Sequence, residues 1–249
     1  MTLEVTVWSV FFYALLTALA TGLGALPFLF VRDMSRKWMG VSNAIAGGLM
    51  LAASFGLIYE GVSYSLVRVL IGVLLGLLFI LWSHRVVERY DHLKLTATLK
   101  GVDARKALLI IGIMTLHSAA EGIGVGVSFG GGETFGLFIS LAIAVHNIPE
   151  GLAISLVLVP RGVPVWQAAL WSIFTSLPQP LMAVPAFLFV EFFRPALPVG
   201  LGFAAGAMIW MVFSEIIPDA LEDTTPNSVA VAVTLSVVAM IAFQIIFGG

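Results

Sequence analysis

The chain has 249 residues, of which 60% are hydrophobic and 10% are charged. Ordinary soluble domains carry about 25% charged residues, so water cannot be the main solvent of this chain. The formal net charge is −2, and no cluster of Lys and Arg of the kind that binds phosphates occurs outside one loop, so no nucleic acid partner is expected. Cysteine is absent, which excludes disulfides and thiolate metal sites and leaves His, Glu, Asp, Asn and Met as the residues that can hold a metal.

Eight apolar stretches are long enough to cross the roughly 30 Å hydrocarbon core of a membrane as helices. In chain order they are Val7–Val31, Trp38–Tyr59, Leu66–Ser83, Ala107–Phe129, Thr134–Val159, Val165–Val190, Pro198–Ile217 and Ser228–Phe247. The first stretch is too long for the core of a signal peptide, so we expect it to remain as a transmembrane helix. The composition therefore predicts an all-α, polytopic membrane protein with eight transmembrane helices in the lipid bilayer.

The longest polar segment, about 84–106, joins the third and fourth predicted helices. We expect it to be the only sizeable cytoplasmic loop, and we expect its two histidines, His84 and His92, to be solvated. No other polar segment is large enough to fold by itself outside the membrane, so residues 1–249 predict a single transmembrane domain.

Basic residues are distributed unevenly between the predicted connections. If the N-terminus lies outside, the inner segments hold Arg32, Arg36, Lys37, Arg85, Arg89, Lys94, Lys100, Arg105, Lys106 and Arg161. The outer segments hold only Arg68 and Arg194, which completes the total of 12 basic residues. Because positive charge is retained on the cytoplasmic side, this asymmetry predicts that both termini face outward.

Two pairs of glycines at four-residue spacing indicate where neighbouring helices come close. Gly72 with Gly76, and Gly202 with Gly206, each place two small residues on one face of a predicted helix. We interpret them as packing positions and not as functional residues.

An internal repeat carries the residues with chemical potential. The segment LHSAAEGIGVGVSF, from Leu116, is similar to VHNIPEGLAISLVL, from Val145, and both contain His-x-x-x-Glu-Gly. A spacing of four places His117 with Glu121, and His146 with Glu150, on one face of each helix. If the two helices face each other, two imidazoles and two carboxylates converge.

These polar groups need a partner inside a membrane, where a charged side chain costs about 2.5–3.5 kcal/mol on insertion scales. A divalent cation supplies one, and mixed imidazole and carboxylate ligands suit Zn²⁺, Fe²⁺, Mn²⁺, Co²⁺ or Cd²⁺ better than Ca²⁺ or Mg²⁺. The alternative is a buried His–Glu hydrogen bond within each helix. Pro149 removes a helical hydrogen bond between His146 and Glu150, so a kink with a free Val145 carbonyl is expected there.

HNIPEG at 146–151, preceded by the related HSAAEG at 117–122, resembles the paired metal-binding helices of the ZIP (Zrt/Irt-like) metal transporters, and the chain is most similar to their compact prokaryotic branch. The resemblance implies a primary metal site formed by His117, Glu121, His146 and Glu150, with Asn147 beside it. It also implies that Met50, in GGLMLAASF, joins this site. Without the resemblance, a methionine in an apolar helix is ordinary core filler.

Three residues depart from the usual ZIP pattern: Ser118 stands where Asn is usual, Gln179 where a Glu precedes Pro, and Ser214 where His precedes Glu215. The resemblance implies that an adjoining second site would hold Ser118, Asn147 and Gln179. We therefore predict one strong site and at most a weak neighbour. Glu215 is expected either to line the exit path or to cap its helix near the headgroups.

The resemblance also implies the function: secondary transport of Zn²⁺, with Fe²⁺, Mn²⁺ and Cd²⁺ as further substrates, across the cell membrane into the cytoplasm without ATP. It implies a homodimer, no enzymatic activity and no bound cofactor. Three alternatives stay open from the residues themselves. They are an intramembrane metalloenzyme, although HExxH is absent, a proton-coupled transporter of another solute, and a non-transporting membrane scaffold or metal sensor.

Overall fold

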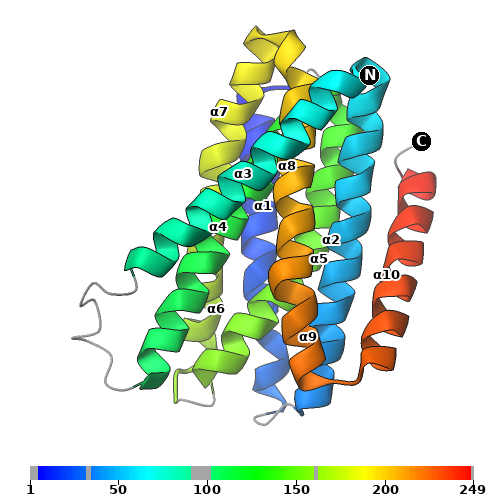
Figure 1. Cartoon of the computed structure of the whole chain (residues 1–249). Helices are drawn as coiled ribbons and strands as arrows, with labels where there is room; N and C mark the ends of the chain where they lie inside the picture. The colour runs from blue at the N-terminus through cyan, green and yellow to red at the C-terminus, as the bar shows by residue number, and fades with distance from the viewer. Residues whose placement is uncertain (1–4, 32–34, 91–101, 160–161, 248–249) are drawn as a thin grey trace.

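The computed structural model describes residues 5–31, 35–90, 102–159 and 162–247, and within them the side chains of all but 87–90, 102–114, 116, 157 and 247. This part of the chain is helical apart from short connections and contains no strand, which confirms the all-α prediction. Inside hydrocarbon every backbone N–H and C=O must find a partner within the protein, and an apolar segment achieves this as a helix. Figure 1 shows the resulting bundle.

The α-helices are α1 (Val7–Leu23), α2 (Arg36–Tyr64), α3 (Leu66–Tyr90), α4 (Val102–Gly130), α5 (Glu133–Leu158), α6 (Val165–Ser176), α7 (Pro178–Phe192), α8 (Leu197–Met211), α9 (Ile217–Asp223) and α10 (Pro226–Phe247). Short 3₁₀ turns at Leu26–Leu29 and Arg194–Ala196 extend α1 and precede α8, and a π-helical turn at Val212–Ile216 joins α8 to α9.

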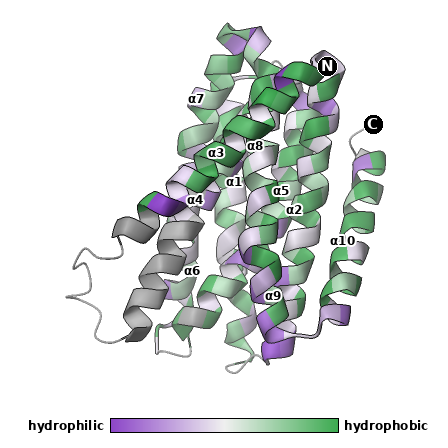
Figure 2. Cartoon of the chain, viewed as in Figure 1, coloured by the Kyte–Doolittle hydropathy of each residue, from purple (hydrophilic) through white to green (hydrophobic). Residues whose placement is uncertain are grey.

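Seven segments of the described chain are long and apolar enough to cross a membrane. They are Val7–Leu29, Arg36–Tyr64, Leu66–Val86, Glu133–Leu156, Val165–Phe192, Arg194–Asp223 and Pro226–Ile246. The remaining predicted span, Ala107–Phe129, falls within α4, but the side chains of residues 107–114 and 116 lie outside the described part. Figure 2 shows hydrophobic residues along the helices and hydrophilic ones mostly near their ends, as a bilayer requires.

The predicted loop at about 84–106 is too long at both ends. Helix α3 continues to Tyr90 and α4 already begins at Val102, so only residues 91–101, which include His92, lie outside the described part. A 25-residue helix is about 37 Å long and exceeds the hydrocarbon core, so the polar end of α3 extends beyond the apolar layer as a helix.

Two predicted spans are interrupted at proline residues. The stretch Val165–Val190 divides at Leu177 into α6 and α7, because Pro178 and Pro180 lack the N–H groups that a continuous helix needs. The stretch Pro198–Ile217 passes through the π-helical turn, which ends two residues before Pro218, and continues as α9 to Asp223. π-helical turns are rare and often occur at functional sites.

The predicted glycine pairs lie where α3 crosses α8. A β-carbon on Gly72 or Gly76 would overlap the backbone of Val199 or Phe203, and one on Gly202 or Gly206 would overlap that of α3. The packing interpretation is confirmed, because the two backbones approach too closely for any side chain between them. By contrast, α10 stands at the edge of the bundle and packs mainly against α2 (Figure 1).

Gly76→Ala is expected to lower the free energy of unfolding by about 1–3 kcal/mol, because the added carbon would overlap the Phe203 backbone. Gly56→Ala is the matched control, since a β-carbon there meets the Gln244 side chain at an ordinary 3.7 Å and alanine favours a helix. Thermal unfolding in detergent measures both variants. Equal stability of the two would contradict the close contact of α3 with α8.

Candidate metal centre

The two halves of the sequence repeat meet inside the bundle, on α4 and α5. Of the four side chains, His146 and Glu121 are fully buried, and His117 and Glu150 are 1% and 5% exposed. The spacing of four residues places each His–Glu pair on one helix face, and the two faces are directed at each other. The structure thus brings together the four residues that the sequence singled out.

The imidazole and carboxylate groups pair between the helices. His146 Nε2 lies 2.7 Å from Glu121 Oε1, and His117 Nε2 lies 3.5 Å from Glu150 Oε1. Each histidine of one helix therefore faces the glutamate of the other, whereas the sequence-based alternative required a hydrogen bond within each helix. Crossed pairs connect α4 to α5 and gather the polar atoms of both helices in one place.

One part of this cluster is open to a further ligand. Candidate ligand atoms of His117, Glu121 and Glu150 all lie within 4.8 Å of one another. Both ring nitrogens of His117, and Glu150 Oε1, have no hydrogen-bond partner among the described residues. Buried polar atoms without a partner are unfavourable, and a divalent cation could bind one ring nitrogen of His117 together with Glu150 Oε1. Imidazole and carboxylate are also the ligands that zinc accepts.

Glu121 is held from its other side by an amide. Gln179 Nε2 donates to Glu121 Oε2 at 2.7 Å, while Gln179 Oε1 accepts from Thr17 Oγ1 at 2.6 Å and from Asn147 Nδ2 at 3.2 Å. Asn147 Nδ2 also donates to the Thr17 carbonyl at 2.8 Å. These bonds join α1, α4, α5 and α7 around one carboxylate, and they fix its orientation.

The predicted second site is occupied by this network of neutral groups. Ser118, Asn147 and Gln179 are all buried, and the two amides bond to each other, although Asn147 Oδ1 has no partner among the described residues. Thr17 was missed by the sequence analysis, because a single threonine in an apolar helix resembles a packing residue. Its spacing of four from Thr21, which bonds Ser176 Oγ at 2.8 Å, was the available signal.

The glycine after each glutamate lets another helix reach the centre. A β-carbon on Gly122 would lie 2.7 Å from Gln179 Cα, and one on Gly151 would lie 2.7 Å from the Thr21 carbonyl carbon. The proline-interrupted start of α7 can therefore place Gln179 against α4, and α1 can place Thr17 against α5. Pro149 lies inside α5, as expected, and Figure 1 shows the last part of this helix running at an angle to the rest.

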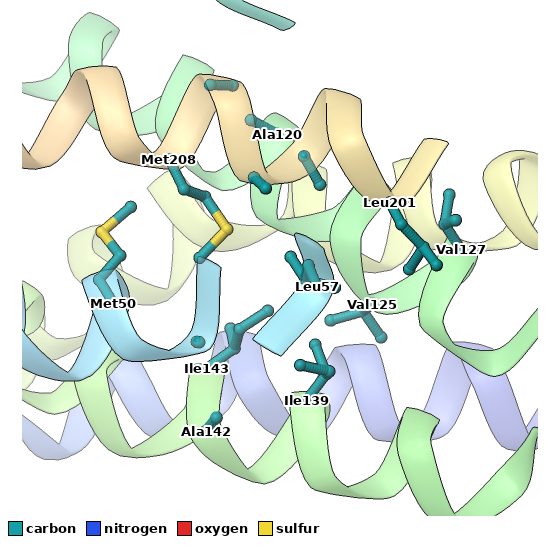
Figure 3. Packing of buried hydrophobic residues seen from close by; sticks show 14 of the residues in the cluster. Met50, Leu57, Ala120, Val125, Val127, Ile139, Ala142, Ile143, Leu201 and Met208 are labelled. Carbon is teal, nitrogen blue, oxygen red and sulfur yellow. The ribbon is translucent and has the colours of Figure 1, made fainter. Parts of the chain in front are cut away.

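Met50 is fully buried on α2 in the same apolar cluster as Ala120, which directly precedes Glu121 (Figure 3).

Glu215 belongs to the π-helical turn, and its Oε2 lies 3.6 Å from His117 Nδ1. Its other oxygen lies 3.6 Å from His84 Nε2, whose ring also meets Trp210 edge-on. The expectation of a solvated His84 is wrong, because α3 continues as a helix and carries this side chain, 25% exposed, to the bundle.

These observations define a class: an integral membrane protein whose helices enclose a cluster of imidazole and carboxylate groups. A family model described as ZIP Zinc transporter matches residues 87–246. Zinc transporter GufA of Myxococcus xanthus is 36% identical over 83% of this chain and 86% of its own length. Zinc transporter ZIPB of Bordetella bronchiseptica is 32% identical over 80% of this chain and 69% of its own. The chain belongs to the ZIP family of zinc transporters.

A further relative is longer than this chain. A protein of Arabidopsis thaliana described as a candidate zinc transporter is 52% identical over 98% of this chain, which spans 40% of that relative's length. The names of the family and of these relatives are those of transporters and not of enzymes, as the resemblance implied. The metalloenzyme alternative is therefore set aside.

Gln179→Ala is expected to lower the free energy of unfolding by about 1–3 kcal/mol, because Glu121 Oε2 would lose its buried donor. Gln167→Ala, which truncates a half-buried glutamine in the first turn of α6, is the control and should change stability little. Thermal unfolding of the purified protein measures the stability of both variants against the wild type. If both variants unfold with the wild type, the amide does not hold Glu121.

Proposed function

We propose that this chain carries divalent transition-metal cations, with zinc as the foremost substrate, across the cell membrane into the cytoplasm by a secondary mechanism without ATP. The crossed His–Glu pairs of α4 and α5 are the observation that carries the proposal. The names of the related GufA and ZIPB proteins support zinc, and Fe²⁺, Mn²⁺ and Cd²⁺ are further candidates because they accept the same ligand types.

In this proposal the cation binds to His117, Glu121, His146 and Glu150, with Asn147 and Met50 beside it. Two carboxylates balance the charge of one divalent cation, and the imidazoles complete a mixed ligand set. Glu121 and His146 also bond to each other across the α4–α5 interface, so an ion that leaves does not leave the Glu121 carboxylate without a partner. That exchange of partners favours a site that binds an ion and also releases it.

The path beyond the cluster leads past Glu215. Its two carboxylate oxygens lie 3.6 Å from ring nitrogens of His117 and His84. Glu215 also lies in the only π-helical turn of the described chain. The proposal includes eight transmembrane helices, namely α4 and the seven spans described above. It also places both termini outside the cell and the release of the ion on the cytoplasmic side. The homodimer that the resemblance implies also belongs to it, and the mass of the particle in lipid nanodiscs measures that state.

Purified wild-type protein in proteoliposomes is expected to take up Zn²⁺ with saturation, and the His117→Ala/Glu150→Ala variant should lose this uptake, because the crossed pair 3.5 Å apart is removed. Loss of essential ligands lowers metal affinity by at least roughly 10–100-fold. Glu133→Gln, at the start of α5 and away from the cluster, is the matched control. Parallel measurements with Cd²⁺, Fe²⁺ and Mn²⁺ rank the substrates. Unchanged uptake by the double variant would overturn the assignment of this site.

The neutral second position gives a further prediction, on stoichiometry. Wild-type protein is expected to bind one Zn²⁺ per chain in this region, because Gln179 offers Glu121 an N–H donor where a second ion would need a carboxylate. Gln179→Glu adds that carboxylate and should raise the number of bound ions. Equilibrium dialysis with elemental analysis counts them, and two tightly bound ions in the wild type would contradict the prediction.

A further inference from the structure

Sulfur enters the centre of the bundle from two helices. The chain contains nine methionines and no cysteine, so every sulfur atom is a thioether. Met50 of α2 and Met208 of α8 are both fully buried and belong to the same cluster of core residues. Figure 3 shows Met50 extending from α2 towards α8, and Met208 extending from α8 towards α2.

The register between α4 and α8 places Met208 level with the His–Glu cluster. A β-carbon on Gly200 would meet Val127 at 2.8 Å, and one on Gly124 would meet Ala204 at 3.3 Å, so the two helices run antiparallel in contact. One turn further along both helices, Met208 comes opposite Ala120. Figure 3 shows these two residues on facing helices.

Ala120 lies directly before Glu121 and three residues after His117 on α4. Two turns beyond Met208, the continuation of α8 brings Glu215 Oε2 to 3.6 Å from His117 Nδ1. The segment that follows α8, through the π-helical turn, thus brings a carboxylate to the cluster two turns after Met208 comes opposite Ala120.

We propose that Met208 is a specificity-determining residue that presents its thioether, together with Met50, to the cation held by the His–Glu cluster. Thioether sulfur is a soft ligand without charge, so it favours soft ions without adding to the two carboxylates. A methionine side chain is also unbranched and flexible, which lets its sulfur move onto a passing ion. The pair raises the preference for Cd²⁺ over Zn²⁺, whereas leucine at either position would offer only apolar surface. The inference rests on the proposed function, since it assigns a role at the same site.

The direct test detects sulfur next to a bound ion. The whole purified chain is loaded with Cd²⁺ and studied by X-ray absorption at the cadmium edge, where a sulfur neighbour can only be a methionine because cysteine is absent. We expect sulfur in the wild-type spectrum and less of it in Met208→Leu. Met240→Leu is the matched control, because Met240 is also buried, at 4% exposure, but lies on α10. A wild-type spectrum with only nitrogen and oxygen neighbours would overturn the proposal.

Uptake by proteoliposomes provides the functional measurement. Met208→Leu should lower the ratio of Cd²⁺ uptake to Zn²⁺ uptake by roughly tenfold, the lower end of what loss of a group around a metal usually causes. Met240→Leu should leave the ratio unchanged, and an unchanged ratio in Met208→Leu would also overturn the proposal. If the wild type takes up neither ion, the proposed transport fails, while the cadmium spectra still decide whether Met208 contacts the ion.

A labelled wild-type protein covers the case in which Met208→Leu does not fold. Selenomethionine keeps the shape of every methionine side chain, so this protein needs no substitution. Absorption at the selenium edge should then show a cadmium neighbour after Cd²⁺ is added. Its absence would count against the thioether contact as firmly as the wild-type cadmium spectrum.

Discussion

The hydrogen-bonded contact between Glu121 and His146 is the constraint on which the centre of the bundle depends. A fully buried carboxylate is tolerated only when all of its acceptor positions are well satisfied, and the two oxygens of Glu121 meet His146 and Gln179, each at 2.7 Å. Each of these partners comes from a different helix, and Gln179 in turn needs Thr17 of α1. Four helices must therefore meet at one point. The close approach of their backbones restricts which residue types can stand around that point.

That approach explains the glycines and prolines that accompany the polar residues. Gly122 and Gly151 follow the two glutamates because the backbones of α7 and α1 lie where their side chains would be. The break at Pro178 and Pro180 starts α7 at the level of the centre, so that Gln179 stands in its first turn with its amide directed at α4. The repeated Glu-Gly unit thus combines a polar group with the space that a third helix needs to reach it.

The sequence predicted the parts of this arrangement that depend on periodicity within one helix. A spacing of four placed His117 with Glu121 and His146 with Glu150, and the spaced glycines indicated the contact of α3 with α8. It did not predict that each histidine pairs with the glutamate of the other helix, because that pairing depends on the axial register of α4 relative to α5. Nor did it predict the role of Thr17, which depends on a partner 162 residues away. The hydropathy pattern also did not reveal the break at Leu177. Pro178 and Pro180 lie among residues apolar enough to keep the mean hydropathy of this stretch high.

The two sides of the His–Glu cluster differ in charge. Glu121 and Glu150 match the charge of one divalent cation, and Gln179 and Asn147 close one side of the cluster with neutral amides. On the other side stands Glu215, a further carboxylate at 3.6 Å from His117, held in a backbone turn that proline loosens. The side towards Gln179 therefore holds only neutral amides, whereas the side towards Glu215 holds a carboxylate. In the proposed transport, the side of the cluster towards Glu215 would therefore attract a cation more than the side closed by Gln179.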